Sequence, residues 1–211
     1  MNGPTLQERQ RQVREDAILE AAHELLGEQG YAAMSMDELA ARVGVSKATL
    51  YQHFASKEEL AINVIVQVMR FNENLLTSAP AGLAAVTRLE QALQRGIERR
   101  AGLWALQMPL MPQNVLQHPR FVEQRRRLDA AYTSLIDQAK HEGDLTATLP
   151  TPVIVRAFTG LFRLDVHDLC ATCGLTPTEV SDHLVNLVFN GMRATTQPTR
   201  GDVPPVTQEI V

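Results

Sequence analysis

Apolar residues recur along most of this chain at intervals of three and four positions, which places them on one face of an α-helix. The pattern is clear in residues 15–30, where Ile18, Ala22 and Leu25 share a face, and again in 57–76 and 85–104. No segment alternates apolar and polar residues long enough to predict a strand. The pattern predicts an all-α fold of about nine helices.

Helix starts and stops divide the N-terminal third of the chain into short pieces. Ser35 with Glu38 and Ser56 with Glu59 match the S-x-x-E capping box, in which each side chain bonds the other residue's backbone N–H. We expect Gly30 to end the first helix in a left-handed conformation, and we expect Gly44 to end the second. Ser46 can cap a third helix, so these residues predict a compact three-helix unit that ends in a helix-turn-helix.

Longer helices follow. Prolines interrupt the chain at 109 and 112, and helices are expected at 119–143, 152–172 and 177–194, the last with a capping box from Thr176 and Glu179. The predicted division is a helix-turn-helix domain at 8–56, a larger helical domain at 57–196 and a flexible tail at 197–211.

The segment VGVSKATLYQHF, residues 43–54, forms the predicted third helix and carries candidate chemistry. Val45, Leu50 and Phe54 should pack inward. The outward residues are Lys47, Ala48, Thr49, Tyr51, Gln52 and His53. Lys47, Tyr51 and His53 can donate to phosphates, and Thr49 and Gln52 can address base edges in a DNA major groove. Small Ala48 allows close approach to a surface. This is the surface that a helix-turn-helix presents to DNA.

The stretch AAHELLGEQGYAAMSMDELAARVGVSKATLYQHFASKEEL resembles the N-terminal domain of the TetR (tetracycline repressor) family of transcriptional regulators. The shared features are the GY before the turn, the SMDELA opening, VGVSKATLYQHF and SKEEL. The resemblance implies DNA contacts from Ser35, Ser46, Lys47, Ala48, Thr49, Tyr51, Gln52, His53 and Lys57. Many members carry threonine where Met36 stands, so no phosphate contact is expected from that position.

The charge of the chain sets a puzzle for this assignment. The formal net charge is −4, and residues 1–60 alone hold six Lys or Arg against ten Asp or Glu, which is also −4. We expect a segregated surface, with bases facing phosphate and acids facing away. The bases in question are Arg9, Arg11, Arg14, Lys47 and Lys57, and so few of them predict a modest salt dependence of DNA binding.

A cytoplasmic protein is expected, without a membrane segment. The first sixteen residues are polar and charged, unlike a secretory signal, and the longest apolar run, AINVIVQVM, is too short to cross a bilayer. The sequence holds no nucleophile triad, phosphate-binding glycine loop or H-E-x-x-H motif, so no enzyme and no cofactor is predicted.

The resemblance also implies a homodimer on a palindromic operator, formed through the last two helices, and a repressor that a small, mostly apolar effector releases. Candidate residues for the effector pocket are Trp104, Met108, Met111, Phe121, Tyr132, Phe158, Phe162 and His167. Arg156, Arg163 and Asp165 are further polar candidates.

Two alternatives stay open. The helical body could recruit a protein partner to DNA, or His167, Cys170 and Cys173 could sense thiol chemistry or a metal. Three ligands from one helix make a poor tetrahedral zinc site, so no metal is predicted.

Overall fold

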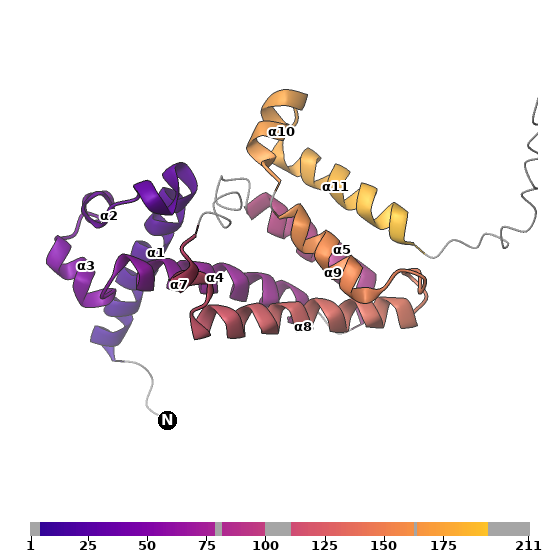
Figure 1. Cartoon of the computed structure of the whole chain (residues 1–211), viewed down its shortest axis with the longest axis horizontal. Helices are drawn as coiled ribbons and strands as arrows, with labels where there is room; N and C mark the ends of the chain where they lie inside the picture. Colours follow the sequence, from indigo (N-terminus) through magenta and orange to yellow (C-terminus); the bar gives the residue numbers. More distant parts are fainter. Residues whose placement is uncertain (1–4, 79–81, 100–110, 163, 194–211) are drawn as a thin grey trace, which may run out of the picture.

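The computed structural model describes residues 5–78, 82–99, 111–162 and 164–193. Within these ranges the chain forms ten α-helices, nine of them at least seven residues long, and one isolated β-bridge between Leu145 and Arg193 (Figure 1). The predicted all-α fold is confirmed.

Three helices form a unit at one end of the molecule, at the left of Figure 1. These are α1 (Leu6–Ala33), α2 (Met36–Val43) and α3 (Lys47–His53). Gly44 ends α2 in the left-handed conformation, with φ 75° and ψ 33°, and Ser46 caps α3 by accepting a hydrogen bond from the Thr49 backbone N–H. Both of these predictions are confirmed. We call α1–α3 the N-terminal unit.

The expected end of the first helix was wrong in detail. Gly30 has a positive φ of 78°, but its ψ of 171° is not left-handed helical. The backbone kinks at this glycine, and a further turn brings α1 to Ala33. At its other end α1 begins at Leu6, since Thr5 and Glu8 form a reciprocal capping box that sequence reasoning missed.

Two of the three predicted capping boxes form only by half. Ser35 and Ser56 accept the expected backbone hydrogen bonds, from Glu38 and Glu59 respectively. The glutamates bind elsewhere, however. Glu38 accepts from the side chain of Gln29, and Glu59 accepts from the backbone N–H of Ala55. The third box, between Thr176 and Glu179, is complete.

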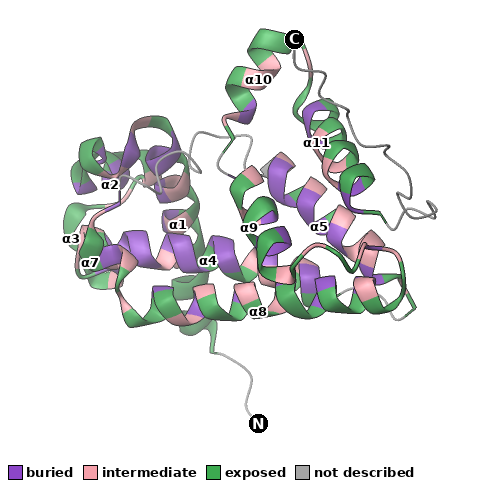
Figure 2. Cartoon of the chain, turned by 45° about the vertical axis from the view of Figure 1, so that its right-hand side comes forward, coloured by how far each residue is buried: buried purple, intermediate pink, exposed green. Residues whose placement is uncertain are grey.

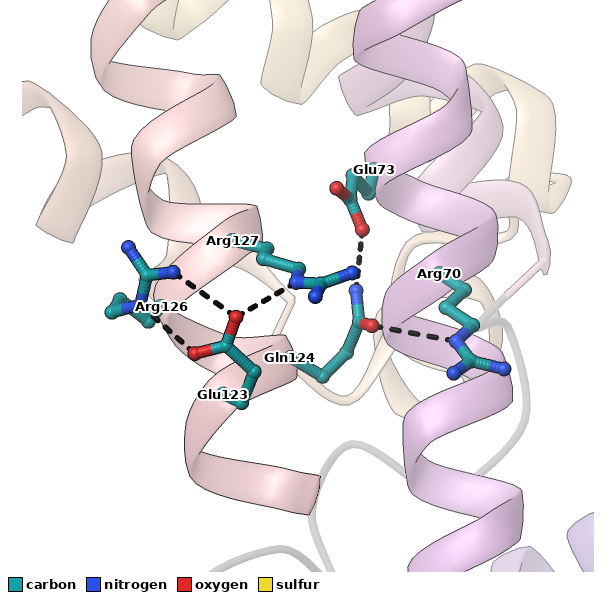
Figure 3. Close-up of polar contacts among 6 residues, drawn as sticks. All are labelled: Arg70, Glu73, Glu123, Gln124, Arg126 and Arg127. Carbon is teal, nitrogen blue, oxygen red and sulfur yellow. Dashed lines mark hydrogen bonds and ion pairs between the residues drawn. The ribbon is translucent and has the colours of Figure 1, made fainter. Parts of the chain in front are cut away.

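Helix α4 (Lys57–Thr77) runs from the N-terminal unit into the rest of the chain, where α8 (Pro119–His141) lies alongside it (Figure 1). Gln124 of α8 is buried between them and bonds two residues of α4, accepting from Arg70 and donating to Glu73 (Figure 3). A buried amide that satisfies both of its polar ends fixes the register of the two helices.

The arginine run at 125–127 is a solvated helix face. Arg126 and Arg127 both pair with Glu123, which lies three and four positions before them on α8 (Figure 3). Hydrogen bonds from these two arginines lower the pKa of Glu123 to about 2. Arg125 pairs with Asp129. The positive charges are thus matched on their own helix.

The remaining helices close the core around α8. They are α5 (Ala85–Arg99), α7 (Gln113–Leu116), α9 (Thr151–Leu161), α10 (Val166–Cys173) and α11 (Pro177–Met192). Tyr132, Phe158 and Phe189 meet in the interior, the last two edge to face with ring centroids 5.4 Å apart. We call α5 and α7–α11 the body. Figure 2 shows that α10 and one side of α11 remain largely exposed.

A single helix over 152–172 was predicted, and this prediction was wrong. Helix α9 ends at Leu161, and α10 starts afresh at Val166. The Asp165 carboxylate caps α10 by accepting from the Asp168 backbone N–H at 2.9 Å. Because aspartate competes for backbone bonds in this way, it favours a new helix start over continuation of the old one.

The predicted domain boundary at 56 and 57 coincides with the start of α4. Helix α4 packs on both α1 and α8, so it belongs to neither side alone. The division therefore stays a prediction, and the tail 197–211 lies outside the described residues.

Gly96 provides a test of the packing between α5 and the end of α9. A Cβ at this position would lie 2.7 Å from the Phe162 ring, well inside van der Waals contact. We expect Gly96→Ala to lower the free energy of unfolding by about 1–3 kcal/mol, in spite of alanine's higher helix propensity. Urea unfolding measures this change. In a Phe162→Leu background the additional cost should be smaller, and a fully additive double variant would contradict the proposed contact.

Candidate nucleic-acid interface

Helix α3 is held by apolar residues on its inner side. Leu50 and Phe54 are buried in the core, and Val45 packs against it from the turn before the helix. The Val45 backbone N–H also donates to the Ala40 carbonyl at 3.0 Å, which closes the turn from α2. The predicted inward set is confirmed, and it leaves the opposite side of α3 toward solvent.

The outer side of α3 presents five exposed residues and one half-buried residue. The exposed residues are Ser46, Lys47, Ala48, Tyr51 and Gln52. Thr49 is half-buried, and its hydroxyl lies 2.8 Å from that of Ser46. Tyr51 is 42% exposed, which is unusual for a large aromatic side chain without a partner surface. We call these six residues the α3 face.

His53 does not lie on this face. Its side chain is only 8% exposed, and its Nδ1 lies 3.1 Å from a carboxylate oxygen of Glu15 on α1. Arg11 donates to the same oxygen at 2.9 Å. Glu15 therefore joins the end of α3 to the first helix.

Lys57 and Ser35 lie at the helix starts where the sequence placed them. Ser35 is exposed and caps α2. The Lys57 ammonium sits 4.6 Å from the centre of the Tyr31 ring and donates to the Ala32 carbonyl, so it holds the end of α1. Burial lowers the pKa of Lys57, and burial, followed by the nearby Glu58 charge, raises the pKa of Tyr31. Met36 is buried, which agrees with the absence of a phosphate contact there.

Acidic and basic residues of the N-terminal unit are less segregated than expected. Lys47 lies 2.8 Å from Asp37 at the start of α2, and a hydrogen bond from Lys47 to this carboxylate raises the lysine pKa. Arg42 makes two parallel bonds to Glu28 of α1, at 2.7 and 2.8 Å, which lower the pKa of Glu28. Part of the negative charge of the N-terminal unit is thus neutralised by internal ion pairs. The pair of Lys47 and Asp37 lies beside α3, and the pair of Arg42 and Glu28 joins α2 to α1.

Residues 18–64 match the model of the bacterial regulatory proteins of the tetR family, and this range contains the whole helix-turn-helix. This segment of the chain is similar to the DNA-binding domain of the TetR family. The members of that family are DNA-binding transcriptional regulators rather than enzymes.

Curated relatives support the same assignment. The transcriptional activator FasR of Mycolicibacterium smegmatis is 41% identical over 88 residues, which cover 42% of this chain and 39% of FasR. The regulator TcmR of Streptomyces glaucescens is 31% identical over 127 residues, which cover 49% of this chain and 56% of TcmR. The matches thus span less than two thirds of either relative.

Solved structures show that the TetR-like fold extends through the body. The fatty acid degradation regulator FadR of Bacillus halodurans superposes with a TM-score of 0.67 at 20% identity, covering 84% of this chain and 99% of FadR. FadR of Bacillus subtilis, solved in complex with stearoyl-CoA, gives 0.66 at 18% identity, covering 83% and 98%. At these identities the likeness concerns the fold.

The candidate effector residues that the structure describes lie in two places. The described aromatic and methionine candidates are all buried in the core, and they are Met111, Phe121, Tyr132, Phe158 and Phe162. None of them lines the cavities near α4 and α5 that the described residues enclose. Trp104, Met108 and Arg163 lie outside the described residues.

The polar and thiol candidates lie on α9, α10 and the turn between these helices. His167 and Cys173 are exposed on α10, and Cys170 is half-buried. Asp165 caps α10, and Arg156 is exposed on α9. In the part of the chain that the structure describes, no three His, Cys, Asp or Glu side chains are grouped to hold a metal ion. Among the same residues, no helix is both long and apolar enough to span a membrane.

Sequence reasoning missed the residues that brace the α3 face from behind. Glu15 and His53 are 38 positions apart, and Lys57 and Tyr31 are 26 apart, so no helical periodicity connects either pair. The clustering of acids on the first helix was visible in the sequence, but their partners were not.

The Glu15 contacts predict a pH-dependent stability. Burial raises the pKa of this carboxyl, but hydrogen bonds from Arg11 and His53 outweigh burial and leave the pKa below its ordinary value of 4.5. A carboxyl with a lowered pKa stabilises the fold above its unfolded pKa, and this contribution is lost as the pH falls through the folded value. Glu15→Gln should therefore reduce the free energy of unfolding at pH 7, and the loss should shrink as the pH drops below 4.5.

Urea unfolding at pH 7 and pH 3.5 checks this expectation. Glu20→Gln, at an exposed position on the same helix, is the control and should have little effect at either pH. A Glu15→Gln cost that does not change with pH would contradict an electrostatic role for the carboxylate.

Proposed function

We propose that this regulator binds a palindromic DNA operator as a homodimer through the α3 face, represses transcription there in the cytoplasm, and is released by a small, mostly apolar effector. The observation that carries the proposal is the α3 face itself. Leu50 and Phe54 anchor the helix from behind, so that its outer side stands free at a rigid corner of the molecule. A protein bound at an operator blocks access to it, so repression is the simplest consequence.

Each residue of the α3 face has a role on DNA. Lys47, at the start of the helix, would leave Asp37 and bind a DNA phosphate. A phosphate can compete with Asp37 for the lysine because this ion pair is exposed to solvent. Tyr51 would donate its hydroxyl to phosphate, and Gln52 and Thr49 would address base edges. Ser46 and small Ala48 would allow close approach of the helix N-terminus.

Ser35, His53 and Lys57 complete the proposed site in different ways. Ser35 is exposed at the N-terminus of α2, where a phosphate would be favoured by the free backbone N–H groups. His53 and Lys57 are engaged with α1, so their proposed contribution is to hold α3 and α4 at the correct angle to DNA.

Homodimerisation is supported by an exposed apolar side of α9 and α11. Leu187 is 73% exposed and Val153 is 55% exposed, and a partner that covers them would remove their apolar surface from water. Gly160 on α9 and Gly191 on α11 have no neighbouring atoms within 4 Å of the position of a Cβ, so a second pair of helices could approach closely. A symmetric four-helix contact would bury these four residues in both protomers.

The contacts of α4 support a link between the body and the DNA-binding face. Asn114 of α7 donates to Glu58 at 2.7 Å, and Arg120 of α8 donates to Asn63 at 2.8 Å. Both acceptors lie in the first two turns of α4. A shift of α7 or α8 would therefore move α4 and, through α1, the α3 face. The stearoyl-CoA bound by the Bacillus subtilis FadR is consistent with an apolar effector for this fold.

Tyr51 tests the DNA role. Tyr51→Ala should weaken binding to an operator selected from random-sequence DNA by about tenfold or more, since it removes a hydrogen bond and an aromatic contact. Fluorescence anisotropy with labelled DNA measures the affinity, and urea unfolding shows whether the fold is kept. Unchanged affinity would remove Tyr51 from the interface. The matched control is Val122→Ala, at an exposed apolar position on α8.

Salt dependence tests the sparse basic surface. The slope of log affinity against log salt is about −0.9 for each phosphate that a protein neutralises. Because Arg11, Arg42 and Lys47 already have carboxylate partners, we expect a shallow slope for the dimer. A slope steeper than about −8 would mean far more phosphate contacts than this surface supplies.

Leu187 tests the dimer. Leu187→Glu places two carboxylates in the symmetric contact, so the dimer dissociation constant should rise by about a hundredfold or more. Analytical ultracentrifugation measures it. Val122→Glu adds the same charge at an exposed apolar position outside this contact and should leave the dimer intact. An unchanged dimer with Leu187→Glu would move the interface elsewhere.

A further inference from the structure

A groove lies between α4 and α5 and is lined by described residues of both helices. Its volume is about 570 Å³, within the range of small-molecule sites. Phe71, Asn74 and Leu75 line it from α4, and Gln91, Ala92 and Arg95 line it from α5. Each set is spaced by one helical turn, so one face of each helix forms a wall.

The groove combines an apolar floor with one positive charge. Phe71, Leu75 and Ala92 supply apolar surface, and Arg95 is the sole charged residue among those that line it. Arg95 is exposed and makes no hydrogen bond or ion pair with a described residue. This sets it apart from Arg120, Arg126 and Arg127, each of which has a partner in the protein. Asn74 and Gln91 add neutral polar groups at the edges.

We propose that this groove is the effector site and that it takes an amphiphile with an apolar chain and a single anionic head. The inference rests on the proposed function of an effector-responsive regulator. The chain would lie over Phe71, Leu75 and Ala92, where it leaves water. The head would accept two hydrogen bonds from the Arg95 guanidinium, which binds carboxylates and phosphates in this way.

The position of the groove connects it to DNA binding. It lies along the C-terminal half of α4, and the N-terminal turns of the same helix contact α7, α8 and α1. A ligand wedged between α4 and α5 would favour a different angle of α4, which the N-terminal unit follows. The site is separate from the buried aromatic cluster of Tyr132, Phe158 and Phe189.

The direct test is binding of 11-(dansylamino)undecanoic acid to the full chain, below its micelle concentration. The dansyl fluorescence should rise saturably at one probe per chain. Arg95→Gln should weaken the probe by about tenfold or more, since a charged hydrogen-bond donor is lost. Arg126→Gln, at an exposed arginine of α8, is the control and should bind normally. The uncharged methyl ester of the probe should bind the wild-type chain about as weakly as the acid binds Arg95→Gln.

Competition identifies the source of the anionic head. Displacement of the probe by dodecanoate but not by dodecanoyl-CoA assigns a carboxylate, and the reverse assigns a phosphate-bearing thioester. Equal probe binding by wild type and Arg95→Gln, or no saturable binding, would overturn the proposal.

Operator binding measured in parallel separates the two levels of inference. If the chain binds its operator but the Arg95-dependent probe site is absent, the groove proposal fails alone. If the probe binds through Arg95 and the operator complex is unaffected, the groove is a ligand site without an effector role, which also overturns the proposal. Failure to bind any selected operator would contradict the proposed function itself.

Discussion

The packing of α4 against both α1 and α8 is the constraint on which the rest of this structure depends. One helix of 21 residues is the support of the N-terminal unit at one end and a wall of the body at the other. Its interior side is apolar except at Asn72, and buried residues occur in every turn from Leu60 to Leu76. Such a helix can transmit displacement, because a sharp kink would disrupt its backbone hydrogen bonds and its close packing.

Polar contacts fix the position of α8 along α4. Gln124 is buried against α4 and bonds both Arg70 and Glu73, so sliding α8 along α4 would leave a buried amide unsatisfied. Asn114 and Arg120 attach to the first turns of α4 in the same manner but nearer to solvent. The body thus bonds the middle of α4 through partly buried contacts and its first turns through exposed contacts. The first turns of α4 are the ones that adjoin the N-terminal unit.

Ion pairs and hydrogen bonds within the N-terminal unit account for part of its negative charge. Glu28 and Glu15 bind Arg42, Arg11 and His53, and in doing so they tie α2 and α3 to α1. Their negative charge serves the internal geometry of the unit. Asp37 lies beside the α3 face, and it forms an exposed pair with Lys47 that a phosphate can replace.

Local signals predicted the helices well. Gly44, Ser46 and Pro119 act within one turn, so their effects can be read from neighbouring residues. Several of the failures involve competition between hydrogen-bond partners. Glu38 and Glu59 accept hydrogen bonds from other donors and not from their capping partners. Asp165 caps a new helix at a place where periodicity alone predicted that the previous helix continues.

The contacts that brace the candidate site, Glu15 to His53 and Lys57 to Tyr31, join residues far apart in sequence. They arise only once α1 crosses α3 and α4, and no spacing rule could predict them. The groove at Arg95 could not be predicted from residue spacing either, because it forms only where α4 and α5 lie side by side.

In the proposed homodimer, two copies of α3 would meet successive turns of one DNA duplex. Hydroxyl-radical footprinting on a selected operator shows whether they do. We predict two protected stretches on one face of the DNA, related by symmetry, with centres about 10–10.5 base pairs or a multiple of this spacing apart. A single protected stretch at saturating protein would contradict this arrangement.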